Sequence, residues 1–350
     1  MNFSFGDFLI SIIHNPILLV ITILISGVIF VNGCSDAPNS IATSVATRCI
    51  SPKKALIMVA ICNILGILVI TFIGATVAET IYNIADFGDN AHLALVALCS
   101  AMVAIVLWTL VTWIFGIPTS QSHTIVATLS GSAIALQNGI SGVNFNEWKK
   151  VIFGIIISTF LGFIFGFLIT KIIQKIFKNS DRRRVKPFFK YGVIIGDAIE
   201  AFLNSAQDVQ KFVAIFMMGV LLSNNVTSIS DLEIPIWMLI MCASILTLGT
   251  CIGGSRIIKN VGMKMAKLET YQATSADIAG AICLISSTLT GIPISTTQTK
   301  TTAIMGVGAA KRFSSVDWNI AKNMVLAWII TFPGSGLLAY IVTNIFLKIF

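Results

Sequence analysis

The sequence predicts an all-α, polytopic membrane protein with about 10–12 transmembrane segments, some of them broken or re-entrant. Of its 350 residues, 56% are hydrophobic and only 11% are charged, whereas soluble chains carry about 25% charged residues. Apolar runs recur along the chain, and each run of about 20 residues is long enough to cross a hydrocarbon layer of ~30 Å. Polar motifs occur twice in the same order, which indicates two halves of related build.

Ten apolar segments account for the membrane-spanning part of the chain. They are 16–47, 54–76, 91–114, 118–137, 149–170, 191–222, 235–254, 271–290, 293–310 and 319–347. Seven cysteines lie in or beside these segments without a CxxC pair, which favours free thiols over disulfides. His123 is one of only three histidines, so we expect it to form hydrogen bonds, and we expect no metal site.

The loops between these segments alternate in charge, and this alternation predicts the orientation. The most basic loop is 171–190, and further Lys and Arg residues lie within 48–54, 256–267 and 311–322. Basic loops stay in the cytoplasm, so both termini are expected on the extracellular side of the plasma membrane. Lys149 and Lys150 are an exception, because they fall on the outer side. These loops explain the net charge of +8, and no nucleic-acid partner is expected.

A repeat relates the two halves of the chain. The segment GIPTSQSHTIVATLSGSAIA (116–135) aligns with GIPISTTQTKTTAIMGVGAA (291–310), and Asn32 and Asp36 align with Asn204 and Asp208. Five segments precede the basic loop and five follow it, so the second half is expected to enter the membrane upside down. The predicted division is a first transmembrane repeat (1–170), a basic cytoplasmic loop (171–190) and a second, inverted repeat (191–350).

An acidic motif interrupts an apolar segment in each half. The first copy, VNGCSDAPNSIATS, places Asn32, Asp36 and Asn39 beside Gly33 and Pro38. Carboxylates and irregular backbone are costly in hydrocarbon and persist beside a cavity or inside protein. One copy is explained by a polar kink that neighbouring helices satisfy. Two matched copies favour a binding site where a broken helix from each half meets the other.

The repeated GIP segments predict the second part of this site. Pro fits the first turn of a helix, and hydroxyl side chains follow it in both copies. These are Ser120 and Ser122 in the first copy and Ser295, Thr296 and Thr297 in the second. Free N–H groups and the positive end of the helix dipole bind oxyanions, although Ser and Thr also cap ordinary membrane helices. Two inverted copies would clamp an oxyanion from both sides.

Further ionisable residues lie within apolar segments. Lys211 follows Asp208 by three residues, so it forms an ion pair with that carboxylate, places a positive charge beside a substrate, or does both. Asp277 is a third acidic candidate for coupling. Asp197 and Glu200 are expected near the cytoplasmic end of their helix, where water solvates them.

Taken together, the four motifs resemble those of the inorganic phosphate transporter (PiT) family. Its members carry a duplicated GANDVANA-type motif and a duplicated G-x-P-x-S-T-T-H-type motif. Here these read NGCSDAPNSIATS with NSAQDVQKFVA, and GIPTSQSH with GIPISTTQ. The resemblance covers essentially the whole chain and implies cation- or proton-coupled phosphate symport. The substrate site that it implies consists of Asp36, Asn39, Ser120, Ser122, Asp208, Ser295, Thr296 and Thr297, flanked by Asn32 and Asn204.

Two departures from the family pattern bear on the coupling ion. Gln210 and Lys211 replace the Ala-Asn of the second acidic motif, a variant that looks like the bacterial branch to which proton coupling is ascribed. Asn63 stands where sodium-dependent relatives tend to carry an acidic residue. Proton and sodium coupling both stay open. The candidate coupling residues are Asn32, Asp36, Asn63, Asn204, Asp208 and Asp277.

We therefore expect a secondary active symporter that imports inorganic phosphate across the plasma membrane by alternating access. Phosphate is favoured over sulfate because it carries a proton at neutral pH, which a carboxylate accepts in a hydrogen bond. The alternative is a permease for sulfate or another oxyanion on the same scaffold. An enzyme acting on lipid phosphates is less favoured. The expected partners are phosphate, a coupling proton or Na⁺ and membrane lipid. No resident cofactor is expected, and assembly as a homo-oligomer stays open.

Overall fold

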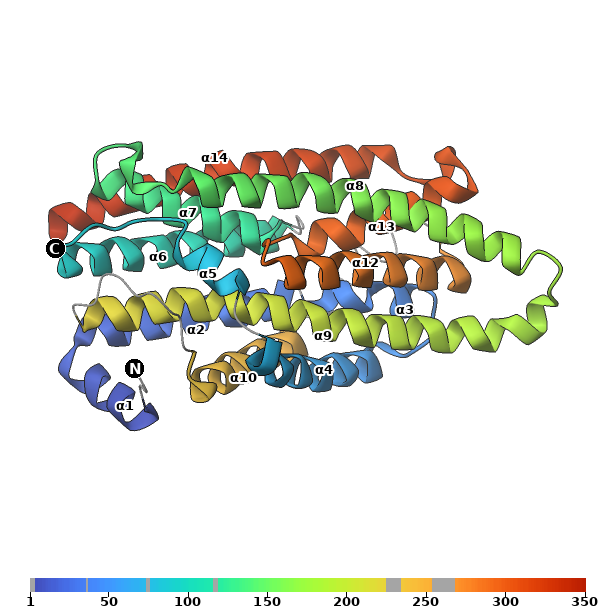
Figure 1. Cartoon of the computed structure of the whole chain (residues 1–350), viewed down its shortest axis with the longest axis horizontal. Helices are drawn as coiled ribbons and strands as arrows, with labels where there is room; N and C mark the ends of the chain where they lie inside the picture. Colours follow the sequence, from blue (N-terminus) through green and yellow to red (C-terminus); the bar gives the residue numbers. More distant parts are fainter. Residues whose placement is uncertain (1–3, 36, 74–75, 116–118, 225–233, 254–267) are drawn as a thin grey trace.

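The protein is a bundle of long helices aligned with one axis of the molecule (Figure 1). The computed structural model describes residues 4–35, 37–73, 76–115, 119–224, 234–253 and 268–350. The α-helices are α1 (Phe5–His14), α2 (Pro16–Ser35), α3 (Ala42–Ala46), α4 (Pro52–Ile73), α5 (Thr76–Tyr82), α6 (Ala91–Phe115), α7 (Gln121–Leu136), α8 (Phe145–Ile176), α9 (Arg182–Ser223), α10 (Ile236–Gly253), α12 (Thr270–Thr290), α13 (Thr296–Lys311) and α14 (Trp318–Ile349). Short 3₁₀ turns are η1 (Ala37–Ile41), η2 (Ile140–Gly142) and η3 (Phe313–Ser315).

The chain is a multi-pass membrane protein by the length and composition of its helices. Among the described residues, seven helical stretches are long and apolar enough to cross a membrane. Three further predicted segments, α7, α10 and α13, form shorter helices. α7 and α13 have 16 residues each, about 24 Å at 1.5 Å per residue, and they are buried along nearly their whole length. These two helices therefore lie at the centre of the bundle.

The two acidic motifs adopt different backbones. In the first half α2 ends at Ser35, and the chain continues through η1 into α3, so this helix is broken as expected. In the second half α9 runs for 42 residues without interruption through Asn204 and Asp208, so the expectation of a second broken helix is wrong. The first copy contains Gly33 and Pro38, which weaken or end a helix. The segment from Asn204 to Lys211 contains neither residue type.

Helices of one half pack mainly against helices of the other half, in matched pairs. α8 contacts α13 as α14 contacts α7, and α2 contacts α10 as α9 contacts α4. Small residues permit these close approaches. A Cβ atom at Gly306 would lie 2.0 Å from the carbonyl oxygen of Phe163, and one at Gly131, its repeat partner, 2.2 Å from that of Gly336. This pairing is what a two-fold repeat requires, while the inverted topology stays a prediction.

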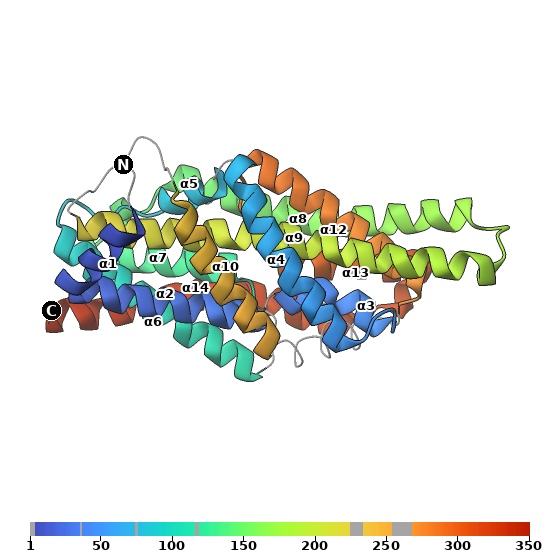
Figure 2. The same ribbon diagram turned by 90° about the horizontal axis from the view of Figure 1, so that it is seen from below.

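The two ends of the bundle differ in charge. α1 and the end of α14 lie at one end, and the turn between α8 and α9 projects from the other (Figures 1 and 2). That turn and its flanks carry Lys175, Lys178 and the run Arg182–Arg184. The helix α1 and the end of α14 thus lie opposite the basic turn, while the side of the membrane that each end faces stays a prediction.

Candidate functional site

The N-termini of α7 and α13 meet in the middle of the bundle, and the two helices run from there toward opposite ends (Figure 1). Ser120 caps α7 by accepting a hydrogen bond from the backbone N–H of His123, and Ser295 caps α13 in the same way from the N–H of Gln298. Both caps use the Ser two residues after the Pro of the GIP sequence, and Ser is a favoured N-cap residue. The positive ends of two helix dipoles therefore converge on one place.

Side chains from three elements join at this meeting point. The hydroxyl of Ser122 donates to the carbonyl oxygen of Ile294 at 3.1 Å, and the ammonium of Lys211 on α9 reaches the same oxygen at 3.5 Å. Ile294 directly precedes the Ser295 cap. The contact therefore connects the first hydroxyl segment, the second hydroxyl segment and the second acidic motif.

Asp208 links the acidic motifs of the two halves. Its Oδ1 accepts a hydrogen bond from Lys211 at 2.9 Å, and its Oδ2 accepts one from the side-chain amide of Asn32 at 3.3 Å. The expected ion pair between Lys211 and Asp208 is thus present. Its two charges cancel, which lowers the cost of holding either of them away from water.

The broken helix of the first half also reaches the second hydroxyl segment. Asn39 in η1 donates from its amide to the hydroxyl of Thr297 at 3.2 Å. Every predicted substrate-site residue that the structure describes is at most 5% exposed. The predicted residues brought together around this point are Asn32, Asn39, Ser120, Ser122, Asp208, Lys211, Ser295, Thr296 and Thr297. We call this set the central site.

The four remaining coupling candidates, Asp36, Asn204, Asn63 and Asp277, differ in their places. Asp36 lies outside the described residues. Asn204 lies on α9 one turn before Asp208, and its Oδ1 has no hydrogen-bond partner. Asn63 donates to the hydroxyl of Thr250 at 3.4 Å, so its contact joins α4 to α10 and does not involve Asp208.

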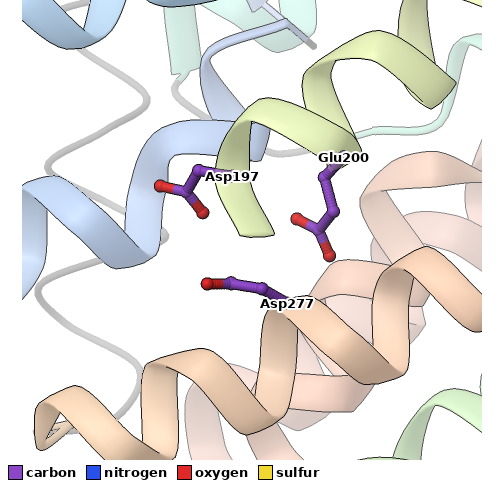
Figure 3. Close-up of side chains that lie close together, drawn as sticks. All are labelled: Asp197, Glu200 and Asp277. Carbon is purple, nitrogen blue, oxygen red and sulfur yellow. The ribbon is translucent and has the colours of Figure 1, made fainter. Parts of the chain in front are cut away.

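Asp277 belongs to a different cluster of charges. One oxygen from each of Asp197, Glu200 and Asp277 lies within 4.8 Å of the other two (Figure 3). Asp197 is 0% and Glu200 2% exposed, so the expectation that water solvates them is wrong. α9 begins at Arg182, and Asp197 is therefore fifteen residues, about 22 Å, inside the helix.

Sequence reasoning missed the cation of this cluster, Lys300. Its ammonium lies 2.6 Å from Asp277 Oδ1, 3.5 Å from Asp197 Oδ1 and in contact with Glu200. The position of this lysine inside the apolar segment 293–310 could have predicted a buried ion pair, because charged residues within membrane helices are rare and are almost always paired.

His123 lies beside the central site. Its ring stacks on Phe332 with centroids 4.4 Å apart, and it is 1% exposed. Its ring also forms a hydrogen bond with the backbone of Trp328 on α14. The expected hydrogen-bonding role of His123 is therefore served by the backbone of α14.

The fold and this site define a membrane transporter built from paired helices around a buried polar site. Residues 32–339 match the model of the phosphate transporter family, and the chain belongs to that family. It is 36% identical over 335 residues to a probable low-affinity inorganic phosphate transporter of Bacillus subtilis (strain 168), covering 94% of this chain and 98% of the relative. A protein of the same description from Rhizobium meliloti (strain 1021) is 36% identical over 89% of this chain and 90% of the relative.

A solved structure has the same fold. The structure described as the sodium-dependent phosphate transporter superposes with a TM-score of 0.85 at 22% sequence identity, and the match covers 96% of this chain and 100% of that one. At that identity the likeness concerns the fold alone. The family and the relatives are transporters, which confirms the expectation that the chain is not an enzyme.

Proposed function

We propose that this protein imports inorganic phosphate across the plasma membrane as a secondary symporter that works by alternating access. The observation that carries the proposal is the convergence of the α7 and α13 N-termini on Lys211 and Asp208. Backbone N–H groups, hydroxyls and one ammonium provide donors for the oxygens of a tetrahedral anion. The names of the two bacterial relatives support phosphate as that anion.

The carboxylate of Asp208 favours phosphate over sulfate. Each carboxylate oxygen has more than one acceptor position, so Asp208 accepts an O–H from protonated phosphate in addition to its bonds from Lys211 and Asn32. Sulfate carries no proton at neutral pH and would face the carboxylate with negative charge only. Asp36 has the corresponding role in the first half by its place in the repeat.

The charge balance explains why a cation or proton travels with the substrate. The pair of Asp208 and Lys211 is neutral as a whole, so a phosphate anion brings uncompensated negative charge into a buried site. A positive charge that enters with the anion removes that cost. The candidate coupling residues around this point are Asn32, Asn204 and Asp208, with Asn63 and Asp277 further away, and Asp36 is a candidate by its place in the repeat. The name of the solved structure supports Na⁺ as one candidate ion.

The test is uptake of radiolabelled phosphate by purified protein in liposomes, with empty liposomes as the control. We expect unlabelled phosphate to displace the label and unlabelled sulfate to leave it unchanged across the pH range. Equal displacement by sulfate would favour the alternative of a general oxyanion permease. Sodium and proton gradients imposed separately then identify the coupling ion.

A further inference from the structure

A buried charge cluster lies between the central site and the basic end of the molecule. Its members are Asp197 and Glu200 on α9, Asp277 on α12 and Lys300 on α13, with exposures of 0%, 2%, 0% and 3%. Figure 3 shows the three carboxyl groups turned toward a common space. Thr43 on α3 completes the set from the first half of the chain. We call this set the α9–α12–α13 cluster.

The cluster carries too much negative charge for its position. Three carboxylates and one ammonium sum to a formal charge of −2, and among the described residues no other charged group acts electrostatically on Glu200, Asp277 or Lys300. Burying an uncompensated carboxylate within a membrane protein is costly, and such a group takes a proton or a cation instead. The cluster therefore binds additional positive charge in this conformation.

The hydrogen bonds of Thr43 indicate that this charge is a proton. Its hydroxyl oxygen lies 2.6 Å from Asp197 Oδ1 and 2.8 Å from Asp277 Oδ1. A hydroxyl has one hydrogen to donate, so it can donate to only one of the two oxygens. The other short contact is a hydrogen bond only if the carboxyl group carries the hydrogen and donates it to Thr43.

Two oxygens without partners support the same conclusion. Glu200 Oε1 and Asp277 Oδ2 are buried and accept no hydrogen bond. Each faces a glycine of the opposite helix, since a Cβ atom at Gly280 would lie 1.9 Å from Glu200 Oε1 and one at Gly196 would lie 3.1 Å from Asp277 Oδ2. An ionised carboxylate requires donors on both oxygens, whereas a protonated carboxyl group tolerates an apolar neighbour.

Asp197 is the carboxylate that stays ionised. Its Oδ2 accepts a hydrogen bond from the backbone N–H of Ser44 at 3.1 Å, and its Oδ1 lies beside Thr43 and Lys300. Asp197 and Lys300 therefore balance each other. The ammonium of Lys300 occupies the position between the carboxyl groups that a bound metal cation would need.

We propose that Glu200 and Asp277 of the α9–α12–α13 cluster bind the coupling proton of this transporter, with Lys300 as a fixed cation that takes the place of sodium. The inference rests on the proposed phosphate transport and specifies its coupling ion. In the transport cycle a proton from the outer water forms an O–H bond with one of these carboxylates, and the same bond breaks to release the proton to the cytoplasm. No other reactant is needed.

The cluster connects to the central site through two short stretches of chain. Thr43 lies four residues after Asn39, and Lys300 lies three residues after Thr297. Asn39 and Thr297 are themselves hydrogen-bonded at 3.2 Å. A proton on Asp277 thus holds α3 against the cluster through Thr43. Its loss adds a negative charge and removes a contact of Thr43, which frees the broken helix to move away from α13.

The test compares Glu200→Gln with wild type in liposomes. Two quantities are measured, the exchange of labelled for unlabelled phosphate without a gradient and the accumulation of phosphate driven by a pH gradient. For each coupled proton a gradient of one pH unit drives roughly tenfold accumulation, because equal concentration ratios correspond to equal free energies. We expect Glu200→Gln to keep exchange but to lose this accumulation, together with the proton influx reported by an internal pH-sensitive dye. The matched control is Glu269→Gln, the same change at an exposed glutamate that pairs with Lys311, and it keeps both activities.

A second pair of variants keeps the test decisive if Glu200→Gln does not fold. Thr43→Val removes the hydroxyl and is expected to lose pH-driven accumulation, whereas Thr43→Ser retains it. The inference is overturned if Glu200→Gln or Thr43→Val shows both the phosphate accumulation and the proton influx of the wild type under the same pH gradient. It is also overturned if wild-type accumulation follows a sodium gradient and not a pH gradient, although phosphate transport would then stand. Absence of phosphate exchange in the wild type would instead contradict the proposed function.

Discussion

At the scale of single residues, the central site depends on one buried ion pair shared between two motifs. Asp208 contacts Lys211 from its own helix and Asn32 from the other half of the chain. Lys211 in turn reaches the carbonyl oxygen of Ile294 at the start of the second hydroxyl segment. A change at Asp208 therefore alters contacts on three elements at once.

Asp208→Asn is expected to reduce phosphate uptake to background. The substitution leaves the buried ammonium of Lys211 without its counter-charge, a change that costs about 3–5 kcal/mol in buried pairs. Loss of stability is separated from loss of function with the double variant Asp208→Asn/Lys211→Gln, which restores neutrality and the melting temperature in detergent but not uptake. Asp89→Asn, at an exposed loop position, is the control. Wild-type uptake by Asp208→Asn would remove this residue from the site.

His123 is expected to bind a substrate oxygen, because its buried ring directly follows Ser122 in the chain and interacts electrostatically with Lys211 of the central site. A hydrogen bond to a charged group contributes about 1.5–3 kcal/mol. His123→Leu should therefore raise the KM for phosphate roughly 10- to 100-fold. His123→Gln keeps an N–H donor and should have a smaller effect, as the repeat partner is Gln298. An unchanged KM in His123→Leu would show that the ring serves only to pack on Phe332.

At the scale of helices, each half contributes the same kinds of element but shapes them differently. The first acidic motif breaks its helix and brings Asn39 to Thr297, while the second remains one helix and presents Asp208 and Lys211 from its side. A broken element can change its path more easily than a continuous one. The first-half segment α2–η1–α3 is therefore the element that we expect to move during transport.

Close helix packing is tested at Gly306, where α13 crosses α8. Gly306→Ala would place a Cβ atom 2.0 Å from the backbone oxygen of Phe163, and overpacking of this kind costs about 1–3 kcal/mol. We expect a lower melting temperature in detergent. Gly27→Ala is the matched control, because nothing lies within 4 Å of its Cβ position and alanine favours a helix. Equal melting temperatures for the two variants would show that the α8–α13 contact adjusts without cost.

At the scale of the whole molecule, the asymmetric charge of the two ends sets the orientation. The first turn of α9, next to the α8–α9 turn, carries the basic run 182–184, and the start of α8 lies at the end that holds α1 and the terminus of α14 (Figure 1). Since cytoplasmic loops are rich in Lys and Arg, the first of these ends is predicted to face the cytoplasm.

This orientation is tested by single cysteines in a variant that lacks the seven native ones. Ser180→Cys lies in the turn between α8 and α9, and Asn146→Cys lies in the first turn of α8. A membrane-impermeant maleimide added to intact cells should label position 146 and reach position 180 only after permeabilisation. The opposite pattern would reverse the topology, and labelling of both positions in intact cells would contradict a membrane-spanning α8.

The sequence predicted the ten main helices well, because long apolar runs have few alternatives to a membrane helix. The segment expected at 149–170 lies within α8, and the one expected at 293–310 nearly coincides with α13. The hydroxyl residues expected at two helix N-termini are also found there, with Ser120 and Ser295 as the N-caps. The environment of Asp197 was not predictable in the same way. Its burial depends on α9 beginning earlier than the apolar run and on α12 and α13 covering it.

By itself, the sequence determined that the chain is a membrane protein, where its helices lie and which polar motifs recur, because apolar length and residue spacing are local properties. Only the tertiary structure decided which of those motifs meet. Asp277 was a coupling candidate together with Asp208 but joins Asp197, Glu200 and Lys300 instead, since α12 packs against both α9 and α13. Contacts between residues more than a hundred positions apart depend on that packing, and no local pattern specifies them.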